Sequence, residues 1–368
     1  MHQALSWSGG ACIGELFILK LPRGLRIALV ANDFSACRVK IWRLAEQLYG
    51  NGSVDLFMVN PIQMQRGLMA ERCHRWTAAH TDLLAKELKS FNVIHLFCDA
   101  TAAVASLLTH LKGRSVVLHR HDIASMRGID DPTEPWVMNH PNTEVVITSP
   151  DHGQWLQKIA PEKTLTFIPN APLKSEMRRL SKRPRRRGIM YYGGLVASPG
   201  TQDSGTGYRF YWPQWRELCR ANIDVHIFPK RTKQNAIAHF YRQLPGCIVH
   251  QPVAADELVS VIAQFEVSFI GYNDIGVDPV RHDYAMSCWP NKAFDPVASQ
   301  TPLLGYKAGS SEAVWKGHWG VATDSLDDLV EGYRSARRLK PDWSRLQKEY
   351  CLDQFADRLV SLYNRVAI

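Results

Sequence analysis

The sequence predicts an α/β protein built from two doubly wound parallel sheets. Short apolar runs of strand length alternate with amphipathic runs of helix length, which is the pattern of strand–helix units that build a parallel sheet. Apolar residues fill consecutive positions of the strand-length runs, as expected where helices cover both faces of a sheet. A basic stretch interrupts the alternation, which then restarts. A chain of 368 residues with this pattern is expected to form two domains.

The first domain is expected to cover residues 1–173. Its strands are short and rich in Val, Ile, Leu and Phe. The expected strands are Arg26–Ala31, Val54–Val59, Val93–Cys98, Ser115–His119, Glu144–Thr148 and Thr164–Ile168. The expected helices are Ala36–Tyr49, Trp76–Ser90, Ala102–Lys112 and His152–Lys158.

Residues 174–187 read KSEMRRLSKRPRRR, and this polar, proline-containing stretch is the expected linker. The second domain then covers residues 188–345. Its expected strands are Ile189–Tyr192, Asp224–Phe228, Cys247–His250, Val267–Tyr272, Pro302–Gly305 and Gly320–Ala322. Its expected helices are Trp212–Ala221, Ala254–Gln264, Asn291–Ser299, Ser311–Lys316 and Leu326–Arg338.

The chain is expected to close with one amphipathic helix, Trp343–Val366. Residues 346–368 are expected to form a C-terminal helical segment, separate from the second domain, that can pack on the first domain.

Composition limits the class of protein. The net charge of +9 and the pI near 9.1 favour polyanionic partners, which include nucleic acid, anionic membrane and nucleoside diphosphates. The eight cysteines include no C-x-x-C pair, so we expect reduced thiols of a cytoplasmic protein. Glu15 and Lys20 interrupt the apolar stretch Ala11–Leu21, which argues against a signal peptide or a spanning helix. Any membrane contact is therefore expected to be peripheral.

The most informative segment is Pro290–Asp295, which reads PNKAFD and opens an expected helix. A loop that enters a helix offers backbone N–H groups and a positive dipole end to a diphosphate. Lys292 adds a full positive charge. Asp295, one turn later, can accept hydrogen bonds from ribose hydroxyls.

This segment, followed by Ser310–Val314, resembles the donor-site signature of GT-B glycosyltransferases, especially those of family 4. That signature has the form P-x-K-x-hydrophobic-E and lies in the second of two Rossmann-like domains that face a cleft. Asp295 stands where the family has Glu. Ser287 stands where retaining members have a second acid, so the sequence does not support retention of configuration.

Three further stretches are similar to the family in the same order along the chain. Ile189–Leu195 looks like the first strand and glycine turn of the nucleotide domain, where Gly193 and Gly194 would let a phosphate approach the backbone. Thr166–Ala171 looks like the Ile-Pro-Asn-Gly stretch that ends the first domain, and His119–Asp122 looks like its His-Asp pair. The resemblance implies a nucleotide-sugar donor at Gly193, Gly194, Lys230, Pro290, Asn291, Lys292, Asp295 and Glu312.

The candidate catalytic residues are Asp122, His121 and Asp33. An acceptor hydroxyl needs a base within hydrogen-bond reach if the anomeric carbon is inverted, and an Asp or a His can serve. The alternative for His121 and Asp122 is a strand-end histidine capped by an aspartate. A metal site at His119 and His121 is disfavoured because no third ligand is nearby, and no D-x-D motif is present. Transfer is therefore expected to be metal-independent.

The leading hypothesis is sugar transfer from a nucleoside diphosphate sugar, with UDP or GDP as the expected nucleotide and no bound cofactor. The acceptor is a hydroxyl group, for which a lipid-linked or polysaccharide intermediate is expected. One alternative is a DNA glycosyltransferase acting on a hydroxylated base. Another is a non-catalytic nucleic-acid-binding protein. The basic stretch Arg178–Arg187 either contacts anionic membrane or DNA, or is a solvated hinge.

Overall fold

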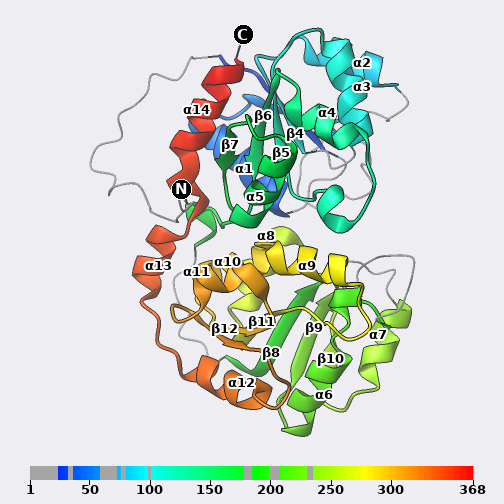
Figure 1. The fold of residues 1–368 in the computed structure, drawn as a ribbon. Helices are drawn as coiled ribbons and strands as arrows, with labels where there is room; N and C mark the ends of the chain where they lie inside the picture. Colours follow the sequence, from blue (N-terminus) through cyan, green and yellow to red (C-terminus); the bar gives the residue numbers. More distant parts are fainter. Residues whose placement is uncertain are drawn as a thin grey trace. The chain divides into compact units, whose positions relative to one another are not determined.

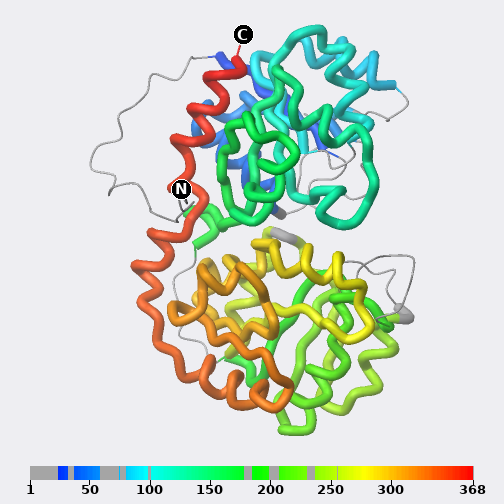
Figure 2. Tube along the Cα trace, in the orientation of Figure 1, coloured from blue at the N-terminus to red at the C-terminus, as the bar shows by residue number. Residues whose placement is uncertain are grey.

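The computed structural model describes residues 24–31, 36–58, 73–75, 80–97, 101–177, 185–198, 207–229 and 235–367. These residues form two compact units. The first unit holds the described residues up to Leu173 and those from Cys351 onwards, and the second runs from Lys174 to Tyr350. Figure 1 shows the elements of each unit, and the colours of Figure 2 show how the chain, in red, returns to the first unit at its end.

The first unit contains a seven-stranded parallel sheet in the order β3-β2-β1-β4-β5-β6-β7. Its strands are β1 (Ile27–Ala31), β2 (Val54–Met58), β3 (Cys73–Arg75), β4 (Val93–Phe97), β5 (Val116–Arg120), β6 (Thr143–Ile147) and β7 (Leu165–Phe167). Its helices are α1 (Ala36–Tyr49), α2 (Thr81–Leu88), α3 (Thr101–Leu111), α4 (Thr133–Asn139), α5 (Pro150–Ile159) and α14 (Ala356–Val366). Every residue of β1, β4 and β5 is buried, as a sheet covered on both faces requires.

The second unit contains a six-stranded parallel sheet in the order β10-β9-β8-β11-β12-β13. Its strands are β8 (Arg186–Gly193), β9 (Val225–Pro229), β10 (Cys247–Val249), β11 (Phe265–Gly271), β12 (Leu303–Tyr306) and β13 (Gly320–Thr323). Its helices are α6 (Trp212–Arg220), α7 (Asn235–Arg242), α8 (Ala255–Ile262), α9 (Pro279–Ser287), α10 (Asn291–Ser299), α11 (Glu312–Trp315), α12 (Leu329–Arg338) and α13 (Trp343–Glu349). The predicted α/β class with two doubly wound parallel sheets is confirmed.

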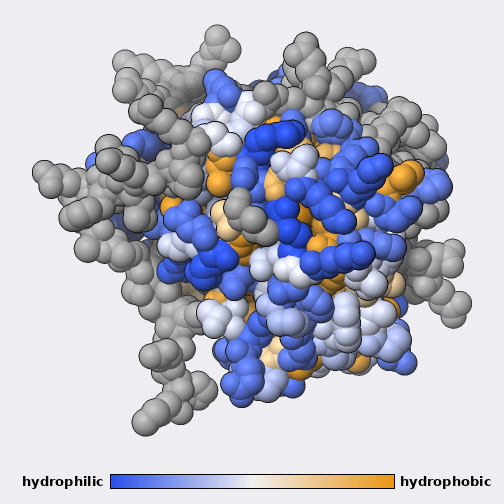
Figure 3. All heavy atoms as spheres, turned by 90° about the horizontal axis from the view of Figure 1, so that it is seen from above, coloured by the Kyte–Doolittle hydropathy of each residue, from blue (hydrophilic) through white to orange (hydrophobic). Residues whose placement is uncertain are grey.

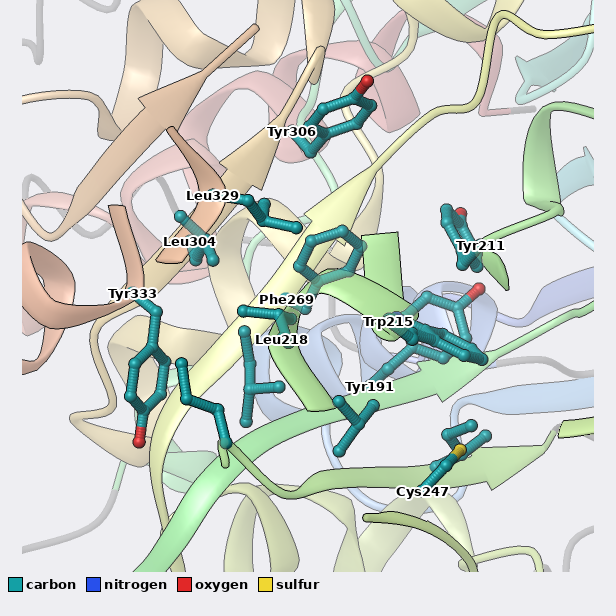
Figure 4. Close-up of a cluster of buried hydrophobic side chains, with 14 of the residues drawn as sticks. Tyr191, Tyr211, Trp215, Leu218, Cys247, Phe269, Leu304, Tyr306, Leu329 and Tyr333 are labelled. Atoms are coloured by element: carbon teal, nitrogen blue, oxygen red, sulfur yellow. The ribbon is translucent and has the colours of Figure 1, made fainter. Parts of the chain in front are cut away.

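Alternate residues of β8 face two different cores. Ile189 and Tyr191 join a large cluster that Trp215 of α6 and Tyr333 of α12 also enter, drawn in Figure 4. Met190 and Tyr192 pack on the other face, against Ile262 and other residues around α8. The strand is therefore buried on both sides, and its polar neighbours can only gather at its ends.

The predicted closing helix Trp343–Val366 is wrong as a single helix. The helix α13 ends at Glu349, a 3₁₀ turn follows at Leu352–Phe355, and α14 starts at Ala356. The break occurs where the chain passes from the second unit to the first. The backbone N–H of Leu352 donates to the carbonyl of Pro172 at 2.7 Å, so this backbone bonds to the first unit instead of continuing a helical ladder.

The last helix, α14, belongs to the first unit. It packs against β4 and β5. Its Arg358 donates to the carbonyl of Phe167 at 3.0 Å, and Arg365 forms an ion pair with Glu144 at 3.0 Å. The end of the chain thus completes the cover of the first sheet.

Several short elements were not predicted from the sequence. They are β3, α4, α7 and α9, each of which is too short or too polar to show a clear hydrophobic period. The start of α9 does carry a local signal, because the Asp278 side chain accepts a hydrogen bond from the Arg281 N–H at 3.1 Å and Pro279 stands at the first helical position. The strand β8 starts at Arg186, earlier than the predicted Ile189.

A fully buried ion pair fixes the loop that follows β5. Arg120 and Glu134 lie 2.8 Å apart, with side chains 0% and 1% exposed. Glu134 also accepts hydrogen bonds from the backbone N–H groups of Ala124 and Ser125, both at 2.9 Å. One carboxylate from α4 therefore holds both the end of β5 and the turn beyond it.

Three histidines are buried among the described residues of the first unit. Burial, together with the nearby His121, lowers the pKa of His95 to about 3. Burial also lowers the pKa of His152 to about 4 and that of His119 well below its usual value. These three rings are therefore neutral in the folded protein at neutral pH.

Every helix within the described ranges is too short or too polar to cross a lipid bilayer. On the face seen in Figure 3, hydrophilic residues cover most of the surface that the described residues form, and apolar residues lie in small separate areas.

The buried ion pair predicts a large difference between two substitutions. Glu134→Gln should lower the free energy of unfolding by about 3–5 kcal/mol, because it leaves the Arg120 charge buried without its partner. Glu144→Gln, which breaks the half-exposed pair with Arg365, should cost about 0–1 kcal/mol. Urea unfolding of both variants measures the difference, and equal losses would contradict the account.

The buried histidines predict loss of stability on acidification. In the unfolded chain these rings bind protons below about pH 6.5, whereas in the folded protein they stay neutral down to about pH 4 or lower. The unfolded state then binds more protons, so each ring lowers stability by up to about 1.4 kcal/mol per pH unit below pH 6.5. Urea unfolding at pH 7, 6 and 5 should show this decline, and His152→Gln should make it shallower. A stability that is constant over this range would refute the prediction.

Candidate functional site

The carboxyl end of β8 carries a cluster of aromatic and cationic side chains. This strand stands where the strand order of the second sheet reverses, between β9 and β11, and open α/β sheets bind ligands at such points. Lys292, from the first turn of α10, extends over the end of β8. Its Nζ donates to the Tyr191 hydroxyl at 3.0 Å and lies 4.2 Å from the centroid of that ring.

Neighbouring rings hold Tyr191 in place. Its ring centroid lies 4.9 Å from that of Tyr211 and 5.4 Å from that of Trp215, and Figure 4 shows these side chains together. The Tyr191 hydroxyl donates to the carbonyl of Gly194 at 2.6 Å. Tyr191 therefore connects Lys292 to the turn that follows β8.

The two glycines of this turn make room for two cations. Gly193 has a φ of 121°, a region that favours glycine. A Cβ there would lie 3.1 Å from Lys292 Nζ, and one at Gly194 would lie 2.7 Å from Arg209 Nη1. Lys292 and Arg209 therefore lie beside the two glycines at which the sequence predicts the approach of a phosphate.

Lys292 and Arg209 are two basic side chains that lie beside adjacent glycines in a partly buried site. Among the described residues, neither side chain has a carboxylate within 4.0 Å. Burial lowers the pKa of Lys292 well below its usual value, and the charge of Arg209 lowers it further. An anion bound between the two side chains would offset both effects.

Pro290 and Asn291 open α10 beside this cluster. Pro290 is the N-cap residue with extended backbone, at φ −77° and ψ 162°, and no side chain caps the helix. The Oδ1 atom of Asn291 is buried without a hydrogen-bond partner among the described residues. The start of α10 thus combines uncapped backbone N–H groups with Lys292, as the sequence predicted for an anion site.

Asp295 and Glu312 have partners within the protein. Asp295 is 3% exposed and accepts a hydrogen bond from the Tyr192 hydroxyl at 2.8 Å. Glu312 accepts the backbone N–H of Ala308 at 3.1 Å and lies 3.6 Å from Lys316. Both carboxylates therefore make contacts that stabilise the second unit, in addition to any contact with a ligand.

His121 and Asp122 lie just after β5, at the carboxyl edge of the first sheet. The ring of His121 stacks on that of His119, with centroids 4.6 Å apart and planes 14° from parallel. Asp122 is 45% exposed and its Oδ2 lies 3.8 Å from Arg127. Asp122 is thus open to a substrate, while the buried Arg120–Glu134 pair anchors the backbone on either side of it.

Some predicted residues lie outside the described ranges. They are Asp33, Lys230 and the basic residues from Arg178 to Arg183. Of the rest of the basic stretch, Arg185 donates to the carbonyl of Gln300 at 2.6 Å, and Arg186 and Arg187 belong to β8. These last three arginines therefore form part of the second unit rather than a free hinge.

Sequence reasoning missed Arg209, Tyr191, His95 and Tyr363. Arg209 stands alone in the aromatic segment Gly207–Trp212 and matches no spacing rule. His95 and Tyr363 read as ordinary core positions of a strand and an amphipathic helix. Only the folded chain brings them together, at 2.8 Å between His95 Nδ1 and the Tyr363 hydroxyl.

In the part of the chain that the structure describes, no group of three or more His, Cys, Asp or Glu side chains is arranged to hold a metal ion.

Comparison with known proteins gives structural matches alone. No family model matches the sequence, and no curated protein matches it. Among solved structures, HepE of Anabaena, solved with UDP and glucose, is 9% identical, with a TM-score of 0.66 over 92% of this chain and 100% of that one. Sucrose-phosphate synthase of Thermosynechococcus elongatus is 13% identical, with a TM-score of 0.63 over 93% of this chain and 98% of that one.

A third solved structure is an alpha-glucosyltransferase in complex with UDP-glucose and DNA containing an abasic site. It is 10% identical, with a TM-score of 0.61 over 92% of this chain and 99% of that one. Each of these matches covers nearly all of this chain and nearly all of the other chain. At such low sequence identity, a match shows a shared fold and not a shared activity. The fold of this protein is therefore the GT-B fold that the sequence predicted.

Proposed function

We propose that this protein is a glycosyltransferase that moves a sugar from a nucleoside diphosphate sugar to a hydroxyl acceptor. The observation that carries the proposal is the pairing of Lys292 and Arg209 at the switch point of the second sheet, without a carboxylate partner among the described residues. The GT-B fold adds support, since the solved structures with that fold include complexes with UDP and UDP-glucose.

In this proposal the second unit holds the donor. Lys292 and Arg209 contact the diphosphate, and the uncapped backbone N–H groups at Asn291 add their dipole. As the bond to the sugar breaks, negative charge grows on the leaving diphosphate, and these preorganised groups stabilise it. UDP is the expected nucleotide, because the neighbouring structures were solved with it.

The first unit supplies the groups that act on the acceptor. Asp122 is the proposed base, because its carboxylate is 45% exposed and follows the stacked histidines at the carboxyl edge of the first sheet. It would take the proton from the acceptor hydroxyl as that oxygen attacks the anomeric carbon. His121 and Asp33 remain the alternative bases.

The acceptor is proposed to be a sugar or a lipid-linked or polysaccharide intermediate. A hydroxylated base in DNA is the second candidate, favoured by the net charge of +9 and by the neighbour solved with DNA. Peripheral contact with anionic membrane through Arg178–Arg183 belongs to the first candidate.

The reaction can be tested by UDP release from UDP-glucose with glucose 6-phosphate, membrane lipid extract or hydroxymethylated duplex DNA as acceptor. Transfer to one of these, detected by mass spectrometry, identifies the acceptor class. Absence of transfer, together with absence of UDP release from UDP-glucose and of GDP release from GDP-glucose, would contradict the proposed function.

Removal of the Lys292 charge should weaken the binding of UDP. We expect Lys292→Ala to raise the Kd for UDP at least about tenfold, since a hydrogen bond to a charged group contributes about 1.5–3 kcal/mol. Lys316→Ala is the matched control, because that lysine is exposed and belongs to the same unit. Calorimetric titration measures both, and an equal Kd in wild type and Lys292→Ala would place the diphosphate elsewhere.

Loss of the proposed base should affect turnover rather than donor binding. Asp122→Asn should lower kcat by roughly 10²-fold or more, with little change in the Kd for UDP. Asp130→Asn, an exposed acid of the same loop, should leave kcat unchanged. A near-normal kcat in Asp122→Asn would contradict Asp122 as the base and would favour His121 or Asp33.

A further inference from the structure

A column of rings runs through the core of the first unit toward His121. The hydroxyl of Tyr363, on α14, lies 2.8 Å from His95 Nδ1. His95 Nε2 lies 3.3 Å from His119 Nδ1, and His119 stacks on His121 at 4.6 Å between centroids. Because His95 belongs to β4 and His119 is near the end of β5, the column leads from the buried face of α14 to the carboxyl edge of the sheet.

Each member of the column carries a single titratable proton. Burial lowers the pKa values of His95 and His119 and raises that of Tyr363 well above its usual value. Both imidazoles are therefore neutral, with one N–H each, and the phenol keeps its hydrogen.

The hydrogen bonds then have a preferred direction. Among the described residues, His95 Nδ1 is the sole partner of the buried Tyr363 hydroxyl, so the hydroxyl must donate or leave its hydrogen buried without an acceptor. If it donates, the proton of His95 is on Nε2 and points to His119 Nδ1. The proton of His119 must then be on its own Nε2, an atom that is buried without a partner in the described part of the chain.

We propose that Tyr363 and His95 are positioning residues, which fix the proton of His119 on Nε2 so that this nitrogen donates a hydrogen bond to an oxygen of the sugar substrate. The inference deepens the proposed function and rests on it for the identity of the ligand. The inference also assigns different roles to residues at the carboxyl edge of the first sheet. His119 is a hydrogen-bond donor and therefore cannot be the base. The base must then be Asp122, His121 or Asp33.

The direction of the hydrogen bonds can be measured without any substrate. Long-range ¹H–¹⁵N spectra of histidine-labelled protein report which ring nitrogen carries the proton, and His119→Gln assigns the signals of His119. We expect His95 and His119 to be protonated on Nε2 in the wild type. In Tyr363→Phe the constraint is removed, so forms protonated on Nδ1 should appear.

Tyr49→Phe is the matched control. The Tyr49 ring lies 5.8 Å from that of Tyr363, and its buried hydroxyl has no hydrogen-bond partner among the described residues. This variant should keep the wild-type spectrum. Protonation of His119 on Nδ1 in the wild type, or a Tyr363→Phe spectrum identical to that of Tyr49→Phe, would overturn the inference.

Turnover tests the contact with substrate. With UDP-glucose, UDP release should fall about tenfold in Tyr363→Phe and His119→Leu, and the Kd for UDP should not change. His119→Gln, which retains an N–H near the position of Nε2, should recover most of the rate, and Tyr49→Phe should match the wild type. Equal rates of UDP release in the wild type and all variants would refute the hydrogen bond from His119 to the sugar, even if the spectra show the expected protonation. A wild type without UDP release would contradict the proposed function, while the spectra would still decide the direction of the hydrogen bonds.

Discussion

Parallel strand pairing is the constraint on which both units depend. All strand pairs that the structure describes are parallel. A parallel sheet needs a crossover after each strand and cover on both faces, so the strands carry apolar residues at consecutive positions. Ligand-binding groups in such sheets gather beyond the carboxyl ends of the strands. The residues of interest accordingly follow β5, at His121 and Asp122, and β8, at Gly193 and Gly194.

At the end of β8 this arrangement brings two basic side chains together. The glycines remove the side chains that would keep Lys292 and Arg209 away, and Tyr191 gives Lys292 an oxygen and an aromatic face but no counter-charge. Such a site is electrostatically unfavourable when empty and favourable when it holds an anion. The proposal that this site binds a diphosphate follows from the two basic side chains without a counter-charge. The fold alone would be compatible with many functions.

The sequence predicted most strands of the two sheets correctly, because each strand is marked by a short apolar run within its own segment. Runs such as Ile27–Ala31 and Val93–Phe97 read as buried strands on their own, and Pro290–Lys292 carries its own helix-start pattern. The break at Tyr350 and Cys351 depends on a hydrogen bond to Pro172, which no local pattern reveals. In the same way Arg209 and Tyr363 became visible only through partners far away in the sequence, at Gly194 and His95.

The central claim is that the second unit binds a nucleoside diphosphate. A thermal-shift titration of the wild-type protein with UDP, GDP, ADP and dTDP tests it most directly, with UMP as the control that lacks the second phosphate. A ligand at 100 times its Kd should stabilise the folded state by about 2.7 kcal/mol. The account predicts a clear rise in Tm with at least one diphosphate, UDP first, and a smaller rise with UMP. An unchanged Tm with all four diphosphates would contradict it.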